Sequence, residues 1–466
     1  MAAVVLALAG CSAGDTPAAD APAAPAVTPT TGPVAGSAGL GDGAFPALGN
    51  GGYDVRKYAL KLRVDPARRR LSGTATITAT ATEELKSFFL DLSRLRVSSV
   101  TVNGRPAADA VVGAKLAVTP RASLPADRPF TIVVHYGGAL VPGDRTVTEP
   151  GRIPVRQLPG GFYTPTAPAS ASSWFPANDH PSDKAAFAVE LSVPEGVAAV
   201  SNGMPGERST RDKRTTWRWS ESGPMAPSAA FLLVGRYQVS TLRHAGKPMV
   251  VAVPAGSAHQ PALDRAAKIA DWLARRFGPY PFSSYGAVVL PDPYAARGLP
   301  AQTRPAFSAT ALGRPTGPAA VAEGLAGQWF GASVTPRTWE DAWLATSFAR
   351  YARWMWTEHD GGATVEAEVS QRYETFPWQA FPAYAPGRAD ALDSEMAADR
   401  GAMTLHALRR RIGDTAFFAL LRSWTASRAY GTATTADFVA AAERASGQDL
   451  DRFFDVWLTG PYRPTY

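Results

Sequence analysis

The hydrophobic period of the sequence changes once, between about residues 240 and 260. Before this point, apolar and polar residues alternate in short segments separated by Gly, Pro and Asn, as in YALKLRV at 58–64. A period of two predicts strands that bury one face, and many short strands with such turns predict an antiparallel β-sandwich-like domain. The predicted strands are 58–64, 73–82, 87–92, 99–104, 130–136, 186–193 and 230–239.

After residue 260, apolar residues recur with the spacing of helices. The stretch ALDRAAKIADWLARRFG at 262–278 places them on one stripe, and Gly278 followed by Pro279 ends the helix. Further helices are predicted at 318–331, 338–357, 393–412, 414–428, 434–445 and 449–458. The sequence therefore predicts an α+β multidomain protein, in which a β domain precedes a mostly helical domain.

Length and composition divide the chain into four segments. A chain of 466 residues is too long for one ordinary core, and its hydrophobic fraction of 45% predicts a largely globular body. Residues 12–44 contain mainly Ala, Pro, Thr, Gly and Ser, which is typical of a flexible linker. We predict a signal segment at 1–10, a disordered linker at 11–44, the β domain at 45–242 and the helical domain at 243–466.

The single cysteine, Cys11, follows a short apolar N-terminal run that ends in Leu-Ala-Gly. This LAGC stretch resembles the lipobox of bacterial lipoproteins, which implies a lipid on Cys11 and export to the outer face of the cytoplasmic membrane. The alternative is a chance match in an Ala-rich segment. One cysteine also excludes an intrachain disulfide and a cysteine zinc site.

The formal net charge is +7, but the basic residues are scattered along the chain. The longest runs are only Arg68–Arg70 and Arg409–Arg411. Nucleic-acid binding usually needs a concentrated basic stripe. We therefore expect no nucleic-acid partner.

Several motifs resemble those of gluzincin metallopeptidases of the aminopeptidase N family, particularly its actinobacterial members. They are LGNGGYDVRKYALKL (48–62), WFPANDHPSDKA (174–185), QTRPAFS (302–308) and QWFGASVTPRTWEDAWL (328–344). The resemblance covers roughly residues 45–466. It implies an aminopeptidase N-type β domain, a thermolysin-like helical domain and a substrate cleft. We expect no C-terminal helical-repeat domain in this chain.

Members of this family hold zinc with a HExxH helix and a Glu on the next helix. Alignment on QWFG places the two His positions on Glu323 and Gly327, the general base on Gly324 and the third ligand on Thr346. The sequence contains six histidines, and no two are three or four residues apart, so it contains no HExxH. The resemblance therefore implies a zinc cofactor for the family but none for this chain.

Three further positions of the family lack the expected side chains. The acid that binds the substrate amine falls on Pro300, and a second amine-binding acid falls on Ala167. The tyrosine that stabilises the oxyanion falls on Ala398. Neither proline nor alanine can bind an amine or stabilise an oxyanion.

The sequence thus favours a non-catalytic relative of aminopeptidase N, a surface-tethered lipoprotein that binds a peptide or protein in the former substrate cleft. The alternative is an active zinc-dependent aminopeptidase with a site of another kind. Three explanations fit the substitutions at the family's catalytic positions: neutral drift, a retained binding role, or deliberate removal of the catalytic residues. We expect Gly324 and Gly327 to leave an enlarged, uncharged cleft floor.

Overall fold

The computed structural model describes residues 32–140, 155–257, 260–291, 301–389, 392 and 394–465. From Pro33 onward these residues belong to one compact unit. The predicted lipidation site Cys11 and the predicted amine-binding position Pro300 lie outside the described residues. The lipobox, the linker up to residue 31 and the role of Pro300 therefore stay predictions. The predicted disordered linker is wrong for residues 32–44, because Val34 and Ala35 pair with β4 (Leu85–Asp91) and the buried Asp42 accepts the N–H of Trp339 at 2.6 Å.

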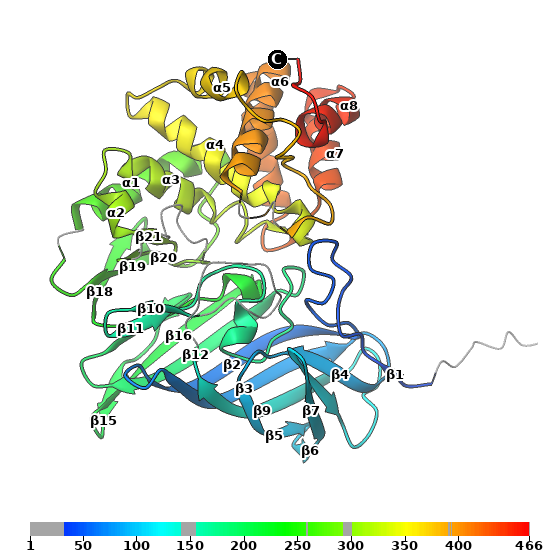
Figure 1. Ribbon diagram of the computed structural model, residues 1–466. Helices are drawn as coiled ribbons and strands as arrows, with labels where there is room; N and C mark the ends of the chain where they lie inside the picture. Colours follow the sequence, from blue (N-terminus) through cyan, green and yellow to red (C-terminus); the bar gives the residue numbers. More distant parts are fainter. Residues whose placement is uncertain are drawn as a thin grey trace, which may run out of the picture. The chain divides into compact units, whose positions relative to one another are not determined.

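One large sheet follows from the alternating segments of the first half of the chain. Its strands lie in the order β14-β16-β12-β2-β3-β9-β5-β6, and β15 pairs with β16 (Figure 1). All neighbours are antiparallel except β2 and β12, which run parallel. The strands are β2 (Tyr53–Asp65), β3 (Arg70–Ala81), β5 (Arg96–Val102), β6 (Arg105–Pro106), β9 (Pro129–Ala139), β12 (Ala185–Pro194), β14 (Met204–Pro205), β15 (Ser209–Arg211) and β16 (Arg214–Met225).

Two smaller sheets accompany the large one. The first has the order β1-β4-β8-β7 and the second has the order β10-β11-β17-β13. Their strands are β1 (Val34–Ala35), β4 (Leu85–Asp91), β7 (Ala108–Val112), β8 (Lys115–Thr119), β10 (Arg156–Leu158), β11 (Gly161–Tyr163), β13 (Ala198–Ser201) and β17 (Leu232–Gly235).

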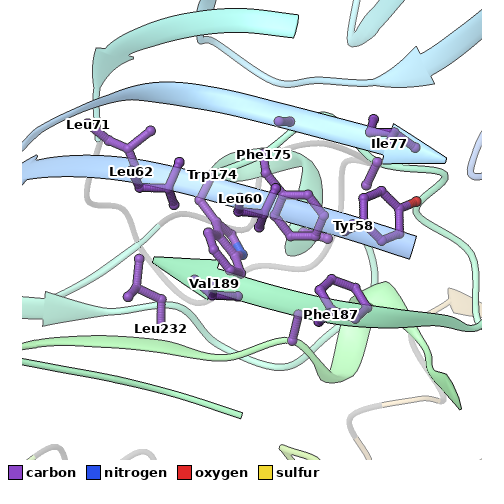
Figure 2. Close-up of a cluster of buried hydrophobic side chains, with 14 of the residues drawn as sticks. Tyr58, Leu60, Leu62, Leu71, Ile77, Trp174, Phe175, Phe187, Val189 and Leu232 are labelled. Carbon is purple, nitrogen blue, oxygen red and sulfur yellow. The ribbon is translucent and has the colours of Figure 1, made fainter. Parts of the chain in front are cut away.

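The core of the β domain consists of the apolar residues at alternate strand positions. Strands β2, β3 and β12 contribute inward-facing side chains, and the WFP segment adds Trp174 and Phe175 (Figure 2). The ring of Tyr58 stacks on Phe187 with centroids 4.9 Å apart. This packing explains why the period of two is so regular in these strands.

The second half of the chain begins with a sheet rather than with a helix. Its order is β18-β19-β20-β21, formed by β18 (Tyr237–His244), β19 (Lys247–Pro254), β20 (Tyr285–Leu290) and β21 (Ala306–Ser308). The sequence pattern did not predict β19, β20 or β21. The predicted domain boundary at residue 242 falls inside β18.

The remaining chain is mostly helical, as predicted, and α4 packs against both α3 and α6 (Figure 1). The helices are α1 (Gln260–Phe277), α2 (Ala309–Leu312), α3 (Gly317–Ala326), α4 (Trp343–His359), α5 (Val365–Tyr373), α6 (Glu395–Ser427), α7 (Thr435–Ser446) and α8 (Asp451–Phe454), with short turns η1 (Ala171–Ser173), η2 (Pro227–Ala229), η4 (Trp339–Asp341) and η6 (Asp455–Thr459). Two short strands, β22 (Thr335–Pro336) and β23 (Thr432–Ala433), pair with each other. The predicted fold class is confirmed.

Helix α6 contains a break at Gly413, whose φ of 80° and ψ of 158° are not helical. The sequence predicted separate helices at 393–412 and 414–428, and the break lies between them. Among the described helices, none has both the length and the apolar character that a bilayer crossing requires.

Candidate functional site

Helix α3 carries three of the predicted site positions and is buried along most of its length. Glu323 and Gly324 lie in its last turns, and Gly327 caps its C-terminus. A Cβ atom on Gly324 would stand 2.4 Å from Cε1 of Phe307, which belongs to β21. The aromatic ring therefore fills the space beside this glycine, and the expectation of an enlarged cleft floor at Gly324 is wrong.

The carboxylate of Glu323 is buried and fully engaged. Its Oε1 accepts a hydrogen bond from Nε of Arg350 at 3.0 Å, and its Oε2 accepts one from Nη1 of Arg353 at 2.9 Å. The side chains of Glu323 and Arg350 are only 6% and 7% exposed. The predicted uncharged floor is therefore a charged one at this end of α3.

The pairing continues from Arg350 to the other helices. Its Nη1 donates to Asp399 of α6, and its Nη2 lies 3.8 Å from Oε2 of Glu395. Nε of Arg372 on α5 lies 3.4 Å from the second oxygen of Asp399. Burial disfavours the charged form of Arg350, but the carboxylates of Glu323 and Asp399 outweigh this effect and raise its pKa. We call Glu323, Arg350, Arg353, Glu395 and Asp399 the charge cluster.

Thr346, the predicted third ligand position, lies in the first turn of α4 and is exposed. Its hydroxyl donates to the carbonyl of Ala342 at 3.3 Å. Arg350 follows four residues later, so the two side chains share one face of α4. Thr346 also lines a small pocket together with Trp339, Trp343 and Ala397.

Ala398 and Ala167 lie in different parts of the structure. Ala398 is buried in the first turn of α6, directly before Asp399 of the charge cluster. Ala167 is half-buried in a turn, where its N–H donates to the hydroxyl of Ser170 at 3.3 Å. The structure thus gathers positions 323, 346 and 398 around Arg350, whereas no contact links Ala167 to this cluster among the described residues.

The sequence pattern missed the residues that hold this region together. Arg350, Arg353 and Asp399 were not among the predicted site residues. One signal was available, because Arg350 interrupts a stripe of large apolar side chains on α4 that includes Phe348, Tyr351 and Trp354. A charged residue in a buried stripe needs a partner of opposite charge.

A second acidic group lies between α7 and α8. In the part of the chain that the structure describes, three His, Cys, Asp or Glu ligand atoms come within 4.8 Å of one another at Glu443, Asp449 and Asp451, not on α3 or α4. Asp449 and Asp451 are exposed, and one oxygen of Glu443 accepts the N–H of Leu450 at 2.9 Å. This group is an ordinary acidic surface.

Models of one peptidase family match both halves of the chain. The Peptidase M1 N-terminal domain matches residues 55–228, and the Peptidase family M1 domain matches residues 317–457. Aminopeptidase N of Streptomyces lividans is 26% identical over 427 residues, which cover 79% of this chain and 46% of that protein. Aminopeptidase M1-B of Oryza sativa subsp. japonica is 25% identical over 442 residues, which cover 86% of this chain and 49% of that protein. The chain thus spans about half the length of these curated relatives.

Solved structures agree over nearly the whole chain. A point mutant of the M1 zinc metallopeptidase from Deinococcus radiodurans, bound to a Tyr-Ser-Ala substrate, has a TM-score of 0.83 and 29% identity. The match covers 92% of this chain and 99% of that one. The same metallopeptidase without that substrate gives a TM-score of 0.80 at 28% identity. With both M1 domains matched in order and the fold shared, this chain belongs to the M1 peptidase (aminopeptidase N) family and has its two-domain metallopeptidase fold.

Proposed function

We propose that this chain is an M1 homologue without peptidase activity, which binds a peptide or a protein segment in its former substrate cleft. We further propose that a lipid on Cys11 tethers it to the outer face of the bacterial cytoplasmic membrane. The observation that carries the first proposal is the pairing of both Glu323 oxygens with arginines of α4.

The residues at the assigned ligand positions do not fit zinc. A protein zinc site takes three or four ligands from His, Cys, Asp or Glu. Gly327 has no side chain, and the hydroxyl of Thr346 is a poor zinc ligand that already donates to a carbonyl. Glu323 is the one side chain of a suitable type, and two guanidinium groups occupy its oxygens.

The assigned general base and oxyanion positions support the same conclusion. Gly324 and Ala398 carry no group that can move a proton or donate a hydrogen bond from a side chain. The ring of Phe307 also occupies the space that a larger side chain at 324 would need.

Peptide binding is proposed from the family relationship and from the pocket beside Thr346. The Deinococcus radiodurans metallopeptidase was crystallised with a Tyr-Ser-Ala substrate. In this chain the pocket combines two indole rings, Trp339 and Trp343, with small residues such as Ala397. Its lining also includes the charged residues Glu340 and Arg388, so the pocket offers both aromatic and charged groups to a ligand.

Metal content and turnover test the loss of activity. Purified protein, dialysed and analysed by plasma mass spectrometry, should carry well under one zinc per chain and should not hydrolyse aminoacyl fluorogenic amides. Stoichiometric zinc together with chelator-sensitive turnover would refute the proposal and favour the alternative, an active zinc-dependent aminopeptidase.

Calorimetry with a library of short peptides that includes Tyr-Ser-Ala tests the binding role. A bulky Thr346→Trp substitution at this exposed position should weaken binding at least about tenfold, because it fills the pocket. Thr210→Trp on the exposed strand β15 is the matched control and should have no effect. Failure of every peptide to bind the parent, or equal affinity in Thr346→Trp, would contradict the proposed cleft.

Fractionation of the native host tests the tether. Full-length protein should sediment with membranes, and the Cys11→Ala variant should be released, since the polar linker alone supplies little membrane affinity. Equal membrane association of both forms would contradict lipidation at Cys11.

A further inference from the structure

The charge cluster joins three helices through one buried guanidinium. Arg350 of α4 meets Glu323 of α3 and meets Asp399 and Glu395 of α6. The side chains of Arg350, Glu323 and Asp399 are 7%, 6% and 13% exposed. Arg353 adds a second positive charge to the same Glu323 carboxylate, at 2.9 Å.

Such a group is stable only when it is complete. Burying a charge is costly, and removal of one partner leaves the other uncompensated. A guanidinium suits this position because its planar fork of five N–H donors can reach several carboxylates at once. Two arginines face three acids here, and Arg372 of α5 adds a further positive charge beside Asp399.

We infer that the charge cluster takes the place of a metal centre in tying α3 to α4 and α6, and that its two arginines exclude zinc. This inference rests on the proposed loss of the metal site. It goes further in stating that restoring the ligand residues alone will not restore zinc binding.

The physical reason is electrostatic. The substitution Glu323→His removes the acid that Arg350 and Arg353 share. Both guanidinium groups would then lie next to the new imidazole, within a few ångströms of an incoming divalent cation. Like charges at such distances in a buried site repel strongly, because little water screens them.

Zinc affinity of three variants tests this inference, with Zn²⁺ and a competing fluorescent chelator as the probe. The first variant carries Glu323→His, Gly327→His and Thr346→Glu. The second adds Arg350→Gln and Arg353→Gln, which keep hydrogen-bond donors but remove both charges. The third instead adds Arg265→Gln and Arg411→Gln, which change the net charge equally but lie in an exposed ion pair and an exposed hydrogen bond.

The second variant should bind zinc at least about tenfold more tightly than the first, and the third should match the first. Equal affinity of the first and second variants would overturn the inference while leaving the proposed function intact. Stoichiometric zinc in the parent protein would instead refute the proposed function. These two failures are therefore distinguishable.

A double-mutant cycle in the parent chain keeps the test available if the zinc variants do not fold. Glu323→Gln and Arg350→Gln should each lower the melting temperature, and the double variant should lose less than the sum of the two. Additive losses would mean that the two side chains are not coupled, and would overturn the inference.

Discussion

Two of the regions in which the protein buries charged groups make this burial tolerable in different ways. In the charge cluster every buried carboxylate faces a guanidinium. In the β domain, Asp91 pairs with Lys115 at 2.6 Å, but Asp179 lies fully buried nearby and forms no ion pair with any of the cations that the structure describes. Ion pairing offsets the cost of burying the charge cluster, whereas the burial of Asp179 is favourable only when its carboxyl group is protonated.

The surroundings of Asp179 explain this dependence. Its Oδ2 accepts the N–H of Ser172 at 2.9 Å, while its Oδ1 has no hydrogen-bond partner among the described residues. Burial, and secondarily the charge of Asp91, raise the pKa of Asp179 to about 7. Burial also raises the pKa of the paired acids Asp399 and Asp91, but in these two cases the neighbouring cations lower the pKa in part. A buried acid without a cation therefore makes stability depend on pH near neutrality.

The largest effect is expected from Arg350→Met, which removes the buried cation that Glu323 and Asp399 share and leaves them only the more exposed Arg353 and Arg372. We expect a loss of roughly 3–5 kcal/mol in the free energy of unfolding, measured by urea denaturation. The control is Arg265→Met, which breaks the exposed pair with Asp360 and should cost at most about 1 kcal/mol. Similar losses in both variants would show that the charge cluster is not a buried, coupled unit.

A smaller effect, which depends on pH, is expected for Asp179→Asn. The folded-state pKa of Asp179, about 7, lies above the ordinary value of 3.8, so its contribution to stability is present below pH 4 and is lost as the pH rises through 7. The parent should therefore lose roughly 2–4 kcal/mol more than Asp179→Asn between pH 4 and pH 8. Urea denaturation at both pH values measures this difference, and identical pH slopes would contradict the role of Asp179.

The smallest effect concerns the packing beside the charge cluster. Ala usually stabilises a helix by about 1 kcal/mol relative to Gly. Gly324→Ala should instead destabilise the protein by roughly 1–3 kcal/mol, because the new methyl group meets the ring of Phe307. Thermal denaturation measures the change, and Phe307→Leu should relieve part of it. A stabilised Gly324→Ala variant would show that this end of α3 is loosely packed.

The fold was largely predictable because the apolar residues of the sequence recur with the clear periods of strands and of helices. Alternation in strands such as β2, β3 and β12 and the break at Gly413 could be found in the sequence. Strand β20 could not, because all six of its residues are buried and its sequence YGAVVL does not alternate. The parallel pairing of β2 with β12 also depends on contacts between distant segments.

The candidate site was predictable only in part. The motif alignment selected Glu323, Gly324 and Thr346 by sequence position, and the structure places Glu323 and Thr346 near Arg350. The motif alignment could not predict the partners of Glu323, because Arg350 lies 27 residues away and Asp399 lies 49 residues beyond Arg350. The close approach of Phe307 to Gly324 likewise depends on the packing of β21 against α3.

The central claim is that Glu323 serves an ion cluster and not a metal. A crystal structure of the protein grown with excess Zn²⁺, with diffraction data collected at the zinc absorption edge, tests this claim most directly. We expect Glu323 bound to Arg350 and Arg353, with no anomalous peak between α3 and α4. An anomalous peak at this position, with the Glu323 carboxylate turned away from the arginines and coordinating the ion, would contradict the account.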